Sequence, residues 1–135
     1  MKIRGKIGVI DSQDALIGNP AYDLASLIDD VRIKNSKKLK NKIYNYYLIK
    51  SKKNLKNNSK IFLEDFNILS VQRCLKIIGI FSRLFKRDKK DQYLKFIPYT
   101  WQILELRMKG KIFSELKKIL DENVSRKIRK ININK

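Results

Sequence analysis

Residues 64–86 read EDFNILSVQRCLKIIGIFSRLFK, and this stretch decides the fold. Its apolar residues recur at helical spacing over an arc too wide for a surface helix, so we expect a helix at the centre of the core. Gly79 costs about 1 kcal/mol of helix propensity relative to alanine, which predicts close approach by another backbone at this position. Cys74 has no neighbour with metal-ligand spacing and is interpreted as a small, buried side chain.

Two shorter helices are predicted before the central one. The pair Asn19-Pro20 supplies an N-cap and a first-turn proline for a helix over 20–33. Ser36 is suited to cap an amphipathic helix over 36–50, whose polar face is almost entirely lysine.

The remaining segments are placed by their helix-breaking residues. Pro98 separates two predicted helices, and Gly110 is suited to cap the second of them. The predicted segments are a solvated linker over 51–60, helices over 91–97, 98–109 and 112–122, and a frayed tail over 125–135.

The chain opens with residues that alternate loosely around Gly5. They predict a short β-hairpin within about 1–12, whose second strand ends at Asp11. The sequence therefore predicts a single domain over 1–135 that is mainly helical between about 20 and 122.

Composition limits the class of protein. The chain has 135 residues, and none of its apolar runs approaches the roughly 20 residues that span a bilayer. The short run Ile7 to Ile10 falls below the length of a secretory signal, and the single cysteine fits a reducing compartment. We therefore expect a cytoplasmic protein without a membrane partner.

The net charge of +19 favours an anionic partner, because basic surfaces attract phosphate backbones and acidic membranes. Residues 31–63 carry eleven cations and no acid. However, Ile, Lys and Asn together make up 55 of the 135 residues and share A/T-rich codons, so a genomic bias accounts for much of the lysine. Whether 31–63 is a binding patch or a solvated surface stays open.

The chain contains no histidine, which excludes His-dependent triads and histidine-ligated zinc sites. Acids instead gather near the N-terminus. Asp11 ends an apolar strand and Asp14 lies in the turn behind it, an arrangement that can present oxygen ligands to Mg²⁺. The alternative from spacing alone is that these acids form the turn and cap the next helix.

Three segments of the sequence resemble motifs of one protein family. Residues 7–30 read IGVIDSQDALIGNPAYDLASLIDD, residues 72–81 read QRCLKIIGIF, and residues 93–98 read YLKFIP. These blocks resemble, in the same order, segments of aminoglycoside-phosphotransferase-like (choline kinase superfamily) kinases, above all the anomeric N-acetylmuramate/N-acetylglucosamine kinases of cell-wall recycling. The resemblance covers about residues 6–104 and implies the C-terminal helical lobe of a protein-kinase-like fold.

The resemblance implies roles for five residues. Asp11 matches the aspartate that holds Mg²⁺ on the phosphates of ATP, and Asp23 matches a structural aspartate that braces the catalytic loop. Asp14 matches a position near the phosphates and the acceptor sugar, without an assigned chemical step. Arg73 and Lys76 match helix positions on the acceptor side, where cations can meet a sugar carboxylate; the alternative is that they form ion pairs that orient the helix.

Two departures from the family pattern bear on catalysis. Ser12 stands where the family has a phenylalanine behind the metal site, so we expect Asp11 to be held more loosely. The ten residues before Asp11 contain no Asp, Asn or His, so the family's catalytic H-x-D-x-x-x-x-N loop is not found, and no glycine-rich phosphate loop is present. No catalytic residue is therefore assigned.

We accordingly expect a C-terminal fragment of an ATP-dependent amino-sugar phosphotransferase that is inactive alone. A separately encoded N-terminal kinase half would then be its partner, with a gene fragment as the other origin. The alternative is a basic helical module that binds nucleic acid or an anionic surface. It rests on charge alone, because Tyr44, Tyr46 and Tyr47 fit the buried stripe of a helix better than stacking platforms, and we do not expect a nucleic-acid partner.

Overall fold

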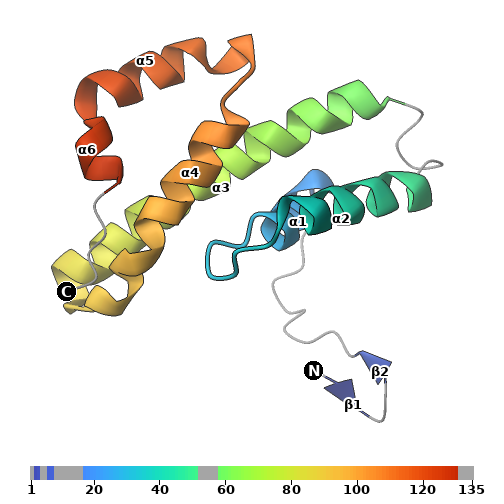
Figure 1. Cartoon of the computed structure of the whole chain (residues 1–135), viewed down its shortest axis with the longest axis horizontal. Helices are drawn as coiled ribbons and strands as arrows, with labels where there is room; N and C mark the ends of the chain where they lie inside the picture. The colour runs from blue at the N-terminus through green and yellow to red at the C-terminus, as the bar shows by residue number, and fades with distance from the viewer. Residues whose placement is uncertain (1, 4–5, 8–16, 52–57, 131–135) are drawn as a thin grey trace.

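The computed structural model describes residues 2–3, 6–7, 17–51 and 58–130. Within them lie strands β1 (Lys2–Ile3) and β2 (Lys6–Ile7), which pair antiparallel with Lys2 opposite Ile7. The rest of the expected hairpin, including the strand end at Asp11, lies outside the described residues. The prediction of a mainly helical chain is confirmed (Figure 1).

The longest helix, α3 (Ser59–Asp88), is the centre of the fold as predicted. It begins five residues earlier than expected because the side chain of Asn58 accepts a hydrogen bond from the Ile61 amide at 3.3 Å and caps it. It ends at Lys89, which takes the left-handed conformation with φ 53°, while the next amide bonds back to Leu84.

Helix α1 (Ala21–Ile28) is shorter than the predicted 20–33. The amide of Asp29 still donates to the carbonyl of Ala25, but the chain then turns, and the carboxylate of Asp30 accepts a bond from the Arg32 amide at 2.8 Å. A short polar side chain that bonds the backbone two residues ahead favours a turn over a helix.

Helix α2 (Lys37–Lys50) agrees with its prediction, and Ser36 caps it by accepting from the Leu39 amide at 3.2 Å. The predicted aromatic stripe is confirmed in part. Tyr44 and Tyr47 pack on Phe62 of α3, whereas Tyr46 is 62% exposed. The reason is geometric, because Tyr46 is two residues from Tyr44 and so lies away from its face of the helix.

The C-terminal elements are a 3₁₀ helix η1 (Asp91–Phe96), α4 (Ile97–Arg107), a 3₁₀ turn η2 (Lys111–Phe113), α5 (Ser114–Asn123) and α6 (Arg126–Arg129). Of these, η1 and α4 pack along α3, whereas the chain then turns back so that α5 contacts η2 and α6 contacts α4 (Figure 1). The predicted break at Pro98 is confirmed to within one residue, since it stands in the first turn of α4. Gly110 does not cap α4, because that helix ends at Arg107 with Met108 as its C-cap, and Gly110 has an extended backbone with φ −76° and ψ 154°.

Two buried clusters surround α3. One joins α1 to the N-terminal half of α3, and it consists of Ala21, Leu24, Ala25, Ile28, Phe62 and Phe66. The other joins α3 to α4 and η2, and it consists of Val31, Val71, Cys74, Trp101, Ile103, Leu104, Met108 and Phe113. Cys74 is buried as predicted, and burial, reinforced by the charge of Asp29, raises the pKa of its thiol to about 11.

Two predictions from local sequence are wrong. Gly79 does not mark a close backbone approach, because a Cβ added there would meet nothing within 4 Å. The tail was expected to fray over 125–135, but residues 126–129 form α6, and Arg129 is only 4% exposed. Its guanidinium bonds to the carbonyl oxygens of Leu120 and Val124, which fastens this part of the tail.

Among the described residues, none of the helices combines the length and the apolar character needed to cross a bilayer.

Candidate functional site

A buried carboxylate lies where the four main helices meet. Asp29 follows α1 directly and is 1% exposed. It is placed inward because it continues the buried face of that helix, four residues after Ala25 and eight after Ala21. The turn after α1 therefore places the carboxylate of Asp29 in the interior.

Three side chains from three different helices hold this carboxylate. Arg107 of α4 donates from Nε at 2.8 Å and from Nη2 at 3.1 Å, in the two-pronged geometry that guanidinium and carboxylate groups favour. Lys40 of α2 donates from Nζ at 3.0 Å, and Ser70 of α3 donates from Oγ at 2.7 Å. We call Asp29, Lys40, Ser70 and Arg107 the Asp29 cluster.

The Asp29 cluster keeps its carboxylate ionised. Burial by itself raises the pKa of Asp29, but the hydrogen bonds and charge of Arg107, with those from Ser70 and Lys40, outweigh it and leave the pKa below its ordinary value. One anion faces two cations, so the cluster carries a net positive charge at neutral pH. Because of this excess positive charge, the site can attract an anion.

Aromatic rings help to position the two cations. The Arg107 guanidinium lies 4.7 Å from the centroid of the Phe66 ring, and the Lys40 ammonium lies 5.8 Å from that of Tyr99. Both arrangements are cation–π contacts. The cations are therefore held on two sides, by charge and by ring faces.

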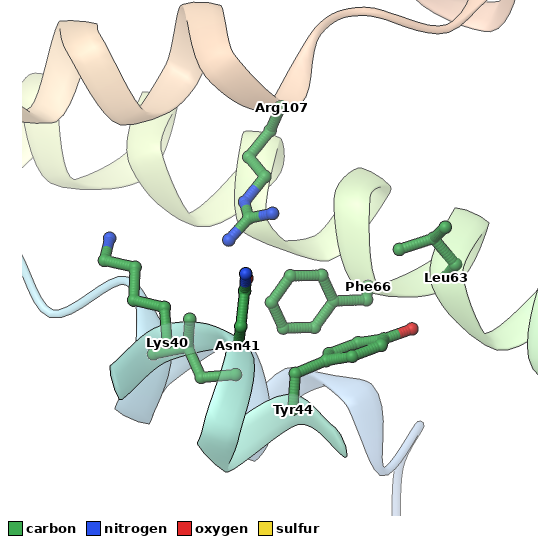
Figure 2. Close-up of a pocket in the computed structure, with 7 residues that line it drawn as sticks. Lys40, Asn41, Tyr44, Leu63, Phe66 and Arg107 are labelled. Carbon is green, nitrogen blue, oxygen red and sulfur yellow. The ribbon is translucent and has the colours of Figure 1, made fainter. Parts of the chain in front are cut away.

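Two pockets open beside the Asp29 cluster. The smaller, of about 140 Å³, is shown in Figure 2, where Arg107 reaches from α4 towards Asn41 and Lys40 of α2. Tyr44, Leu63 and Phe66 close its apolar side. The larger, of about 430 Å³, lies between the start of α2 and α4 and shares Lys40, Asn41 and Arg107 with the first.

Three of the five residues predicted from the family resemblance, Asp23, Arg73 and Lys76, are among the residues that the structure describes, and of these three Arg73 alone bonds to Asp29. Asp11 and Asp14 lie outside the described residues. Asp23 is exposed on the first turn of α1, and Lys76 is exposed on α3. Arg73 donates from Nη1 to the backbone carbonyl of Asp29 at 3.1 Å, a contact that orients α3 against the end of α1.

Within the described ranges, His, Cys, Asp and Glu side chains do not gather in groups of three or more that could hold a metal ion.

Sequence reasoning missed Asp29, Lys40 and Arg107 as a group. Asp29 does carry a local signal, because an acid that continues the apolar face of a helix has to find a cation inside the protein. Lys40 and Arg107 carry no such signal, since each is one of many cations on an amphipathic helix. Their distance from Asp29 along the chain, 11 and 78 residues, hides the contact.

The chain is similar to curated proteins named N-acetylmuramate/N-acetylglucosamine kinase. The relative from Caulobacter vibrioides is 33% identical over 119 residues, which are 88% of this chain and 32% of the relative. Those from Neisseria meningitidis serogroup B and Pseudomonas aeruginosa are 39% and 36% identical, each over 101 residues that are 73% of this chain and 30% of the relative. The predicted likeness to amino-sugar kinases is thus confirmed.

The chain spans about a third of the length of the curated relatives it matches. No protein-family model matches it, and no solved structure matches it. Its place in the wider superfamily and its assignment as a C-terminal lobe stay predictions.

Proposed function

We propose that these 135 residues form the C-terminal helical part of an ATP-dependent amino-sugar phosphotransferase and do not transfer phosphate by themselves. The observation that carries the proposal is the 33–39% identity to proteins named as N-acetylmuramate/N-acetylglucosamine kinases over 73–88% of this chain. The substrate class is taken from those names, and the fragment character from the residues that this sequence lacks.

In this proposal the helical core is a support for the acidic segment that precedes α1. Asp11 and Asp14 come shortly before Ala21, where α1 begins, and the other end of α1 is tied to three helices through Asp29. A helix anchored in this way would give the acidic segment before it a rigid base, which supports precise positioning of the carboxylates of that segment.

The carboxylate of Asp11 is a suitable ligand for Mg²⁺, which prefers oxygen atoms. When bound, Mg²⁺ would neutralise charge on the phosphates of ATP. Asp23 would brace, through hydrogen bonds, a catalytic loop supplied from outside these residues, and we assign no chemical step to Asp14. Arg73 and Lys76 remain the proposed acceptor-side cations, with Arg73 also bonded to the end of α1.

Inactivity of the 135 residues alone follows from how phosphoryl transfer is catalysed. Positioning and electrostatic stabilisation supply nearly all of the rate enhancement, and they require a proton-accepting aspartate and a phosphate-binding lobe. Neither is found in this sequence. A partner half or an adjoining segment would have to supply both.

A transfer assay tests the proposal in two steps. The 135-residue protein with radiolabelled ATP and either N-acetylmuramate or N-acetylglucosamine should yield no sugar phosphate. Fusion of the N-terminal two-thirds of the Caulobacter vibrioides relative to this chain should restore transfer, and Asp11→Asn in the fusion should abolish it. Asp91→Asn, an exposed acid on η1, is the matched control and should leave transfer unchanged.

Two results would contradict the proposal. Sugar phosphate formed by the 135-residue protein and lost with Asp11→Asn would show that the chain is a working kinase. A folded fusion that binds ATP but transfers no phosphate to either sugar would reject the substrate class. The coding sequence upstream of Met1 separates the two origins, since an H-x-D-x-x-x-x-N segment in another frame would indicate a gene fragment, whereas a separate upstream gene would indicate a split enzyme.

A further inference from the structure

The larger pocket between α2 and α4 has an unusual lining. Its polar side chains are three cations, three amides and one phenol, with no carboxylate among the residues that line it: Lys37, Lys40, Arg107, Asn35, Asn41, Gln102 and Tyr99. Its volume of about 430 Å³ lies in the range of small-molecule sites. Cations provide charge and amides provide directed hydrogen bonds, which together suit a polar anion.

The charge in this pocket is not cancelled by the acid beneath it. Asp29 neutralises one of the two cations that bind it, and the neighbouring acid Asp30 is paired with Arg32 at 3.1 Å on the surface. Lys37 adds a further positive charge at the rim. An anion entering the pocket would therefore meet an excess of about two positive charges, counted from the formal charges of these side chains.

Two of the cations are held in place before any ligand arrives. The side chains of Lys40 and Arg107 are only 12% and 18% exposed, and both are fixed by Asp29. Such cations lose less conformational entropy on binding than free surface lysines do. Arg107 uses Nε and Nη2 for Asp29, and its remaining nitrogen, Nη1, makes no hydrogen bond to the residues that the structure describes and can donate to a ligand.

The N-terminus of α2 adds backbone donors. The Ser36 side chain satisfies the Leu39 amide, and the Ser36 carbonyl accepts from Lys40. The first amides of a helix, here those of Lys37 and Lys38, have no partner within the helix and lie at its positive end. With Asn35 and Lys37 on the wall of the pocket, this end is placed to attract an anion.

We propose that this pocket binds a small oxyanion, the phosphate or carboxylate group of a sugar-sized molecule, through Lys37, Lys40 and Arg107, with Asn41 and Gln102 donating to its polar substituents. The proposed acceptor-side residues Arg73 and Lys76 do not line this pocket, and the inference does not depend on the proposed phosphotransferase activity.

Nitrogen–proton NMR of the 135-residue protein provides the test, with glucose 1-phosphate, glucuronate and glucose as probes. We expect saturable shifts of the side-chain amides of Asn41 and Gln102 with the phosphate or the carboxylate probe, and none with neutral glucose. The tighter of the two charged probes identifies the oxyanion. Absence of saturable shifts with both would overturn the proposal.

Variants test whether binding depends on this pocket or on the general positive charge of the protein. Lys37→Met and Asn41→Ala remove exposed pocket residues outside the Asp29 cluster, so the fold should be kept. Each should weaken binding, Lys37→Met by about tenfold, as expected for loss of one hydrogen bond to a charged group. Lys86→Met changes an exposed lysine near the far end of α3. It is the matched control and should not weaken binding.

Equal weakening by Lys37→Met and Lys86→Met would show that binding reflects overall charge and would reject the pocket. Full binding in both Lys37→Met and Asn41→Ala would reject it as well. Circular dichroism of each variant verifies the fold, and a second substitution, Gln102→Ala, replaces any variant that fails to fold.

Discussion

Two charged side chains among the described residues, Asp29 and Arg129, are buried, and they have opposite signs and oppositely charged partners. Asp29 is a buried anion whose cationic partners, Lys40 and Arg107, are mostly covered at 12% and 18% exposure. Arg129 is a buried cation whose anionic partners, Glu105 and Asp121, are 46% and 36% exposed. We call Arg129 with these two acids the Arg129 cluster.

The two clusters also differ in what they connect. Asp29 bonds to residues 11, 41 and 78 positions away, on three different helices. Arg129 contacts residues 5, 8, 9 and 24 positions away, and its guanidinium lies 5.0 Å from the centroid of the Trp101 ring. The first cluster sets how the helices are arranged, whereas the second fastens the end of the chain. Disruption of each should differ in size and in extent.

The largest effect should come from Asp29→Asn. This change keeps the size of the side chain but leaves Lys40 and Arg107 without their anion, and breaking a buried ion pair costs about 3–5 kcal/mol of unfolding free energy. Urea denaturation followed by circular dichroism measures the loss. Asp91→Asn, an exposed acid, should change it by less than about 0.5 kcal/mol. A loss below about 1 kcal/mol in Asp29→Asn would show that the cluster does not organise the helices.

Arg129→Met should have a smaller and more local effect, of about 2 kcal/mol. Water can solvate Glu105 and Asp121 once the guanidinium is gone, because both are substantially exposed. Hydrogen exchange should therefore speed up in α5 and α6 while α3 stays protected. Arg126→Met, an exposed arginine in α6, is the control. Equal loss of protection in α3 would show that the clusters are not distinct.

The response to acid should depend on Asp29. Because the folded-state pKa of Asp29 is lowered, its contribution to stability is complete above its unfolded pKa, near 3.9, and is lost as the pH falls through the lower folded value. Urea midpoints between pH 7 and pH 2 should fall more steeply below about pH 4 in the unmodified protein than in Asp29→Asn. Arg129→Met retains Asp29 and should keep the steep fall; parallel profiles for all three proteins would contradict this assignment.

The smallest effect should come from the exposed pair of Lys118 and Glu122 on α5. Their charged atoms are 4.0 Å apart, and the side chains are 77% and 60% exposed. A pair of this kind on a helix contributes at most about 0.5 kcal/mol. Lys118→Ala should therefore leave the urea midpoint nearly unchanged. A loss comparable to that of Arg129→Met would mean that exposure does not separate strong from weak ion pairs in this protein.

The sequence determined the features that depend on near neighbours. Ser36 capped the expected helix, Pro98 marked the start of α4, and the apolar arc of 64–86 placed α3 at the centre, because each signal lies within a few residues of its effect. The likeness to amino-sugar kinases was also predicted from sequence motifs, and the comparison with curated proteins confirms it.

Only the tertiary structure decided which charges are buried and what they bind. Asp29 and Arg129 are two of many charged residues in the sequence, and the residues next to them do not indicate which side chains they bind. An ion pair forms where packing brings two charges together and excludes water, and packing depends on contacts between helices that the local pattern does not encode. For the same reason the pocket between α2 and α4 could not be predicted, since residues 35–41 and 99–107 are brought together by the packing of α2 on α1 and of α4 on α3.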